Sequence, residues 1–276
     1  IMTSTVGVSP NTIVLIPGLW MTPLCWENWI PRMESRGFTV LAPAWPKMDG
    51  PIEDLRKNPS TVAGLTVSKI VDSYDRIIRA LDTPPIIIGH SFGGAFTQVL
   101  VSRGLGAAAV AIDSAAPKGV LSLPISTLRS SWPVLRNPLN RKKAIGLTPA
   151  QFHYAFANTM TEQESQAAYD RYAVPGPAHV LFEGAMANFS PHSALTVDYK
   201  KSNRAPLLLI AGGSDHIVPA STNRANLKKY ANSKAKTEYK EFPGRAHFTL
   251  GQAGWEEVAD YALNWAIGQT AATSQL

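Results

Sequence analysis

The chain has 276 residues, of which 45% are hydrophobic and 17% are charged, and this composition is typical of a globular protein. No stretch offers the roughly 18 uninterrupted apolar residues of a membrane span, so the sequence predicts none. The formal net charge is +6, but the basic residues are scattered and no nucleic-acid motif accompanies them. We therefore expect no nucleic-acid partner, and the charge would at most favour anionic ligands.

Cysteine usage and the start of the chain bear on location. Cys25 is the only cysteine, so no disulfide forms within the chain and no cysteine cluster can hold a metal ion. The opening IMTSTVGVSPN lacks the basic start and apolar core of a secretory signal. Together these features predict a cytoplasmic protein.

Short apolar runs that end in turn residues predict the strands of a sheet. Continuous apolar runs of this length fit strands that are buried on both faces, as in a parallel sheet. The last run is more polar and suits an edge strand. In chain order the predicted strands occupy residues 12–18, 38–45, 85–91, 107–114, 205–215 and 237–244.

Helical patterns lie between these runs. The clearest is over residues 67–81, where the apolar residues share one helical face. Alternation of strand and helix predicts an α/β fold with a mostly parallel sheet and helices on both faces. The last residues, from 268 on, are expected to fray. The other predicted helices occupy residues 26–35, 92–103, 221–230 and 255–267.

The alternation breaks between residues 117 and 204. This segment holds many prolines and aromatics together with short helical patterns, and it is too long for a simple crossover. It predicts an insertion of small helices above the carboxyl edge of the sheet. The predicted organisation is therefore a core domain of residues 1–116 and 205–276 with an inserted segment of residues 117–204.

One pentapeptide directly follows a predicted strand and precedes a predicted helix. Gly89-His90-Ser91-Phe92-Gly93 fits the pattern Gly-x-Ser-x-Gly. At so sharp a turn the backbone is strained, and glycines two residues before and after the serine relieve the crowding. The turn would present the Ser91 hydroxyl at the carboxyl edge of the sheet as a nucleophile.

A serine nucleophile needs a base, and the base needs an orienting acid. His247 lies in a predicted loop before the last helix, and Asp215 directly follows a predicted strand. The order serine, acid, histidine is the one expected for this architecture. Asp113 also ends a strand and is an alternative acid, whereas His216 is expected to be a loop or wall residue.

The four pieces LIPGLW, GHSFGG, GGSDHIVP and GRAHF occur in the order found in one large family. With them the sequence resembles the α/β-hydrolase fold superfamily, and within it the serine esterases and lipases with a helical cap. The resemblance covers residues 12–267. It implies the α/β-hydrolase fold, identifies residues 117–204 as the cap, and supports Asp215 over Asp113.

The resemblance also implies an oxyanion hole. One donor would be the backbone N–H of Phe92, directly after the nucleophile, and the other that of Leu19 in the loop after the first strand. Similar proteins carry His-Gly-x there, but this chain has Pro17-Gly18-Leu19, so a side chain that would brace the loop is missing.

Four further residues are candidates for the substrate pocket. Trp20 could line the pocket or belong to the core, and His90 could instead pack beneath the turn. Phe156 and Phe189 lie among the aromatics of the insertion, which could form a pocket roof or simply pack the insertion on the sheet.

The predicted activity is hydrolysis of small to medium hydrophobic carboxylic esters through an acyl-enzyme, with lactones and thioesters as further substrates. No metal or organic cofactor is implied, and the oligomeric state is open. One alternative is a lyase or cofactor-free oxygenase of the same fold with His247 as base, although Ile217 stands where similar lyases place a lysine. Another is a weakly hydrolytic small-molecule receptor.

Overall fold

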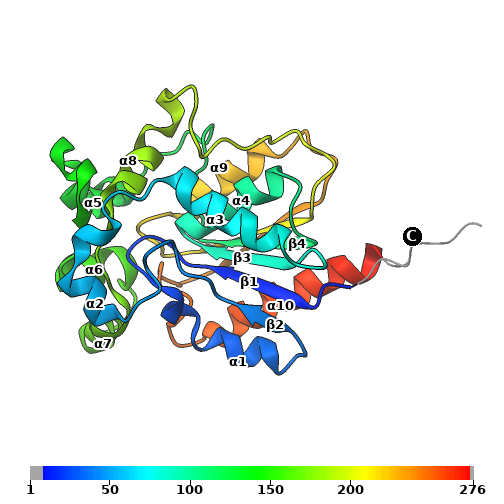
Figure 1. Ribbon diagram of the computed structural model, residues 1–276, viewed down its shortest axis with the longest axis horizontal. Helices are drawn as coiled ribbons and strands as arrows, with labels where there is room; N and C mark the ends of the chain where they lie inside the picture. Colours follow the sequence, from blue (N-terminus) through cyan, green and yellow to red (C-terminus); the bar gives the residue numbers. More distant parts are fainter. Residues whose placement is uncertain (1–8, 274–276) are drawn as a thin grey trace, which may run out of the picture.

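A six-stranded parallel sheet forms the centre of the protein (Figure 1), in a computed structural model that describes residues 9–273. The strands stand in the order β2–β1–β3–β4–β7–β8. The mostly parallel sheet predicted from the apolar runs is confirmed. The strand bounds are Thr12–Ile16 (β1), Thr39–Leu41 (β2), Ile86–His90 (β3), Ala108–Ile112 (β4), Leu207–Gly212 (β7) and Thr237–Phe242 (β8).

The inner strands β1, β3, β4 and β7 are buried along their whole length, whereas the edge strands β2 and β8 are partly exposed. This difference explains the sequence pattern, because a strand covered on both faces requires an apolar residue at every position. The more polar run at residues 237–244 is indeed an edge strand.

Helices cover both faces of the sheet (Figure 1). The helices α3 (Val67–Arg79), α4 (Phe92–Ser102) and α9 (Ala220–Lys229) lie on one face, and α1 (Trp29–Glu34) and α10 (Trp255–Thr273) lie on the other. Among residues 9–273, no helix combines the length and apolar character that crossing a membrane requires.

The strand order reverses at the centre of the sheet. From β1 the chain first adds β2 on one side and then returns to place β3 on the other. At such a reversal the loops after the two neighbouring strands diverge and leave a crevice at the carboxyl edge. The loops after β1 and β3 carry Leu19 and Ser91, so both residues lie at this reversal of the strand order.

Between β4 and β7 the chain forms a cluster of short helices beside the carboxyl edge of the sheet, at the left of Figure 1. The helix α2 (Ile52–Lys57) lies on the same side. A two-stranded antiparallel sheet, β5 (Ala144–Ile145) and β6 (Gly176–Pro177), holds the cluster together. Its helices are α5 (Ile125–Leu135), η3 (Pro138–Lys142), α6 (Pro149–Phe156), α7 (Glu162–Tyr172), α8 (Ala178–Met186) and η4 (Ala187–Phe189).

Two helix boundaries differ from the predictions. The helix expected over residues 26–35 is observed as the shorter α1, which starts at Trp29, and the 3-10 helix η1 (Pro23–Trp26) precedes it. A proline inside a helix clashes with the carbonyl four residues earlier, so α1 begins late enough to place Pro31 in its first turn. At the other end α10 continues to Thr273, past the expected fraying at residue 268, because glutamine and alanine there favour helix. The opening residues 1–8, part of the stretch from which no signal was predicted, lie outside the described residues.

Candidate active site

Ser91 occupies a strained turn between β3 and α4. Its backbone angles are φ 59° and ψ −121°, in a region that residues with side chains rarely adopt. A Cβ atom on Gly89 would lie 2.0 Å from the carbonyl oxygen of Gly93, and one on Gly93 would lie 2.3 Å from that of Ile16. The strand–turn–helix context predicted for the pentapeptide is therefore present, and the two glycines are sterically required.

His247 and Asp215 form a buried pair at the same edge of the sheet. The Nδ1 atom of His247 lies 2.7 Å from Oδ2 of Asp215, and both side chains are fully buried. The other carboxylate oxygen of Asp215 accepts hydrogen bonds from the backbone N–H groups of Ile217 (2.8 Å) and Val218 (3.0 Å). The turn after β7 thus holds the carboxylate in place, and the carboxylate orients the imidazole.

The electrostatics of this pair favour a neutral imidazole. Burial lowers the pKa of His247 to about 3, because the low-dielectric interior disfavours the charged ring. We assign the ring proton to Nδ1, which faces the carboxylate. Within the part of the chain that the structure describes, Nε2 of His247 is buried and has no hydrogen-bond partner. The atom that is free to accept a proton is therefore Nε2, while the Ser91 hydroxyl is not bonded to it here.

A second carboxyl group lies close to this pair. Asp113, directly after β4, is fully buried, and one of its oxygens accepts a hydrogen bond from the N–H of Gly212 at 2.7 Å. Burial and the neighbouring Asp215 carboxylate raise the pKa of Asp113 well above its usual value. The buried site thus favours the protonated form of Asp113, and Asp215 rather than Asp113 bonds to His247.

His90, directly before Ser91, packs beneath the turn. Its Nε2 atom lies 2.8 Å from the backbone oxygen of His247, and the two rings are 4.8 Å apart. His90, Asp113 and His247 form the one cluster of described residues whose ligand atoms, all within 4.8 Å, could hold a metal ion. Nε2 of His90 is already bonded to the His247 carbonyl and Nδ1 of His247 to Asp215. A metal ion requires deprotonated ligands, which the raised pKa of Asp113 disfavours, so this is a poor ligand set.

The loop after β1 lies against Ser91. A Cβ atom on Gly18 would be 2.8 Å from the Cβ of Ser91 and 3.4 Å from the backbone nitrogen of Phe92. Because Phe92 is the first residue of α4, its N–H has no partner within the helix. The indole N–H of Trp45 donates to the Pro17 carbonyl at 2.9 Å and braces this loop, a contact that the sequence analysis missed.

The helical cluster contacts the site through aromatic side chains. Phe156 packs edge-on against His247, with 4.9 Å between ring centroids, and Trp20 packs edge-on against Phe156 at 6.0 Å. The Trp20 indole donates to the Ile145 carbonyl of β5 at 2.9 Å. Phe189 lies elsewhere, since its side chain is 79% exposed in η4. A substrate-binding role for Trp20, His90, Phe156 and Phe189 remains a prediction.

The sequence profile of the alpha/beta hydrolase family matches residues 13–261, almost the whole sheet core together with the helical cluster. The chain belongs to the alpha/beta hydrolase family. This confirms the resemblance drawn from the four sequence pieces. A comparison with curated protein sequences finds no match.

Solved structures of other hydrolases share the fold of this alpha/beta hydrolase. The monoacylglycerol lipase of Paleococcus ferrophilus is 20% identical with a TM-score of 0.64, over 95% of this chain and 97% of that one. An extracellular alpha/beta-hydrolase from a Paenibacillus species is 20% identical with a TM-score of 0.68, over 92% and 98%. A pyrethroid hydrolase from Sphingobium faniae is 16% identical with a TM-score of 0.64, over 94% and 98%.

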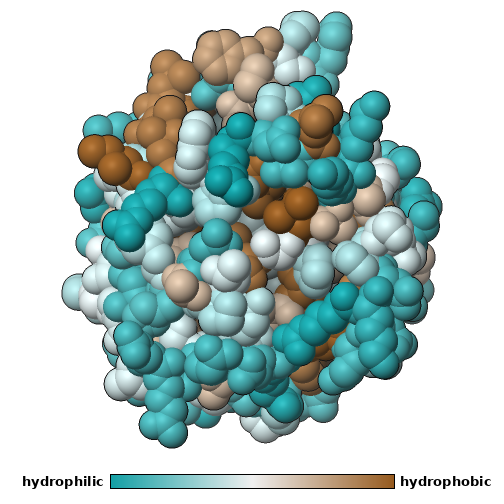
Figure 2. Space-filling view, turned by 90° about the vertical axis from the view of Figure 1, so that its left-hand side faces the viewer, coloured by the Kyte–Doolittle hydropathy of each residue, from teal (hydrophilic) through white to brown (hydrophobic). Residues whose placement is uncertain are grey.

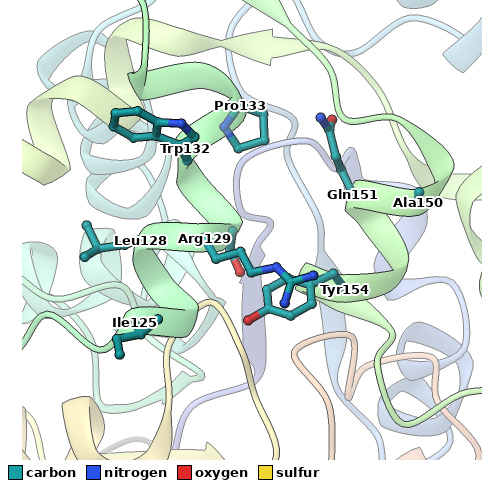
Figure 3. Close-up of a pocket in the computed structure, with 9 residues that line it drawn as sticks. Ile125, Leu128, Arg129, Trp132, Pro133, Ala150, Gln151 and Tyr154 are labelled. Atoms are coloured by element: carbon teal, nitrogen blue, oxygen red, sulfur yellow. The ribbon is translucent and has the colours of Figure 1, made fainter.

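Two hollows of this alpha/beta hydrolase lie in and beside the helical cluster. One, of about 560 Å³, lies between α5 and α6 (Figure 3). The other, of about 230 Å³, lies beside Trp20 and is lined mainly by residues of the cluster. Ser91 lines neither hollow, and its side chain is 6% exposed. Ser91 is therefore almost fully buried in this structure, with the loop after β1 packed against it.

Proposed function

We propose that this alpha/beta hydrolase is a serine esterase that cleaves small to medium hydrophobic carboxylic esters through an acyl-enzyme. The observation that carries the proposal is the buried His247–Asp215 pair, whose free Nε2 atom lies at the sheet edge where Ser91 sits on a strained turn. A neutral imidazole with one nitrogen held by a carboxylate is the arrangement that a general base for serine requires.

In the proposed reaction Ser91 first rotates its hydroxyl toward Nε2 of His247, since hydrogen bonds of this kind often form only in the substrate complex. Nε2 takes the hydroxyl proton while Oγ forms a bond to the ester carbonyl carbon. The resulting oxyanion would accept hydrogen bonds from the N–H groups of Phe92 and Leu19, each worth about 3 kcal/mol of transition-state stabilisation.

The tetrahedral intermediate then expels the alcohol, which takes the proton from His247 and leaves the acyl group on Ser91. A water molecule next gives its proton to Nε2 and attacks the acyl carbonyl carbon. Collapse of the second intermediate returns the proton to Oγ and releases the acid. Asp215 stabilises the imidazolium that forms in each half of the cycle.

The substrate class rests on the apolar character of the cover. Phe156 and Trp20 are the aromatic side chains nearest to His247 and the loop after β1, and both are almost fully buried. An apolar roof favours hydrophobic acyl or alcohol groups, and lactones and thioesters of similar size fit the same chemistry. We assign residues 117–204 as a cap domain that closes over the substrate and residues 1–116 and 205–276 as the core domain.

The deciding experiment is hydrolysis of p-nitrophenyl esters of increasing acyl length, measured in the burst and the steady state. Ser91→Ala and His247→Ala should each lower turnover by about 10⁴-fold or more, because the nucleophile and base act as a unit. His192→Ala, at an exposed position in the helical cluster, serves as the matched control and should keep full activity.

Other outcomes would point to the alternative functions. A burst without turnover would favour a receptor-like protein that retains its acyl group. If wild type and Ser91→Ala behave alike across the whole panel, the esterase proposal is wrong, and a reaction that uses only the His247 base becomes the better hypothesis.

A further inference from the structure

The helix α5 exposes apolar side chains and buries polar ones, the reverse of an ordinary surface helix. Ile125, Leu128 and Trp132 are spaced to share one helical face, and their side chains are 84%, 43% and 61% exposed. Figure 3 shows Leu128 and Trp132 projecting to the same side of the helix. The buried positions include two serines, Ser130 and Ser131, and the Ser130 hydroxyl has no hydrogen-bond partner among the described residues. A surface helix normally places its residues the other way round.

The exposed apolar surface continues beyond the helix. Leu121 and Leu123, directly before α5, are 84% and 69% exposed. Phe189 of η4 is 79% exposed. Its neighbour Asn188 bonds to the backbone of residues 119 and 120, which brings η4 near the segment that leads into α5. We define the α5 face as the six exposed side chains of this surface, namely Leu121, Leu123, Ile125, Leu128, Trp132 and Phe189. Figure 2 shows hydrophobic residues gathered on the upper part of this side of the molecule.

Basic residues follow the α5 face along the chain. Arg136 comes one turn after Trp132, and Arg141, Lys142 and Lys143 lie at the end of η3; all four are exposed. None of them forms an ion pair within residues 9–273. The chain has no aspartate or glutamate between Asp113 and Glu162. The Arg141 guanidinium lies 5.4 Å from the centre of the Phe182 ring. The segment that follows the apolar helix thus carries positive charge without a carboxylate partner among the described residues.

The hollow between α5 and α6 extends this surface inward. Ile125, Leu128 and Trp132 of the α5 face form part of its wall (Figure 3). The Arg129 guanidinium lies 3.9 Å from the centre of the Tyr154 ring across the hollow, so α5 rests on α6 through this pair. Ile125, Leu128 and Trp132 of the α5 face therefore stand on a supported helix.

We infer that the α5 face docks on the surface of an anionic lipid bilayer. Apolar side chains of an interfacial helix enter the headgroup region, and neighbouring basic side chains pair with anionic lipids, which is the combination present here. A second copy of the chain fits less well, because a symmetric contact would set the basic residues of one copy against those of the other. The bound state is peripheral, with the helix lying in the plane of the interface.

The test is co-sedimentation of the full chain with vesicles of phosphatidylcholine alone or mixed with phosphatidylglycerol. We expect binding to the mixed vesicles that weakens with salt, and little binding to phosphatidylcholine alone. The triple variant Ile125→Ser/Leu128→Ser/Trp132→Ser should bind at least about tenfold more weakly. Arg136→Gln/Arg141→Gln/Lys142→Gln should bind about a hundredfold more weakly, whereas Lys228→Gln/Lys234→Gln on the core is the matched control and should bind as wild type does.

Two further measurements separate docking from misfolding and self-association. Thermal unfolding of each variant should match wild type, because the substituted side chains are exposed. Brominated lipids should quench fluorescence of the wild type more than that of Trp132→Phe. The inference is wrong if wild type does not bind the mixed vesicles, or if the charge variant binds them as wild type does. It is also wrong if light scattering shows a dimer that the apolar variant abolishes, since the face then contacts a second copy.

Discussion

The sheet core and the helical cluster treat apolar residues in opposite ways. In the core the inner strands and the whole of α4 from Phe92 to Val101 are buried. All eight large hydrophobic side chains that are exposed among the described residues lie between Leu121 and Phe189, in the cluster. The core therefore buries its apolar residues, whereas the cluster leaves part of its apolar surface exposed, as is typical of surfaces that bind a partner.

The polar groups of the two regions differ as well. The core buries titratable side chains at the carboxyl edge of the sheet, where Asp113, Asp215 and His247 are almost fully enclosed. The cluster carries its charges on the surface. The residues of the proposed active site thus lie in the core, and the surface of the proposed docking face lies in the cluster. The predictions below test this division.

The largest effect is expected from Asp215→Asn. The amide cannot hold the His247 tautomer with a free Nε2, so kcat should fall by about 10⁴-fold. Steady-state hydrolysis of the best p-nitrophenyl ester measures the change. The matched control is Asp113→Asn, the other buried acid at this edge, which should keep kcat within about tenfold of wild type. A larger loss in Asp113→Asn than in Asp215→Asn would show that the acid has been assigned to the wrong residue.

A glycine substitution in the core should cost far more stability than one in the cluster. In Gly89→Ala the new methyl group meets the backbone oxygen of Gly93, which cannot move without breaking the turn, so a loss of more than about 4 kcal/mol is expected. In Gly184→Ala of α8 the new methyl group meets only the tip of the Phe92 ring at 2.8 Å. There the gain in helix propensity offsets the cost of moving the Phe92 ring. The free energy of unfolding should therefore stay within about 1 kcal/mol of wild type. Urea unfolding measures both changes in the free energy of unfolding. Equal losses in Gly89→Ala and Gly184→Ala would contradict the expected difference between core and cluster.

The raised pKa of Asp113 predicts a pH dependence of stability. Its pKa is raised in the folded protein, so above pH about 4 the unfolded chain loses this proton while the folded protein keeps it. Folding stability contributed by this group therefore falls as pH rises. Asp113→Asn removes this dependence. The free energy of unfolding of the variant, relative to that of wild type, should therefore rise by about 1.4 kcal/mol per pH unit above pH about 4, until the folded carboxyl of wild type ionises.

Urea unfolding of both proteins at several pH values measures this difference. The lowered pKa of His247 has the opposite effect and makes stability rise with pH. Below pH about 6.5 the histidine binds a proton in the unfolded chain, whereas the buried ring stays neutral in the folded protein. Comparison of Asp113→Asn with wild type cancels the histidine contribution. A difference between the two proteins that does not change with pH would show that Asp113 is ionised in the folded state.

The smallest effect is expected from Trp45→Phe. The substitution removes the 2.9 Å hydrogen bond to the Pro17 carbonyl and leaves that buried oxygen unsatisfied, at a cost of about 1 kcal/mol. Because Pro17 precedes Gly18 and Leu19, a looser loop should lower kcat by about tenfold with little change in KM. Trp20→Phe is the control variant for Trp45→Phe. It loses only the hydrogen bond from the Trp20 indole to the Ile145 carbonyl of β5, in the helical cluster. A KM effect in Trp45→Phe without a kcat effect would place Trp45 in substrate binding instead.

Much of the core could be predicted from the sequence because its signals are local. Each apolar run that predicts a strand contains one, and the Ser91 turn could be recognised because strand, glycines and helix are contiguous along the chain. The pairing of Asp215 with His247 could also be anticipated, since both residues follow neighbouring parallel strands and so emerge at one edge. Because the carboxyl ends of parallel strands share one edge of a sheet, the strand assignments alone bring these residues to the same edge.

Other features could not be predicted, because they depend on which distant surfaces meet. The inverse amphipathicity of α5 is invisible in its sequence, where Ile125, Leu128 and Trp132 look like a core-facing stripe. Only the packing of the cluster decides that Ser130 and Ser131 face inward.

The sequence by itself determined the parallel sheet, the strained serine turn and the residues that meet at the carboxyl edge. The signals for these features are apolar runs, the glycines around the serine and the alternation of strands with helices, which are all local in the sequence. Tertiary structure alone decided that Phe156 packs against His247, that Trp45 braces the loop after β1 and that burial beside Asp215 raises the pKa of Asp113. Those outcomes depend on burial and on contacts between residues far apart in sequence, which no local pattern encodes.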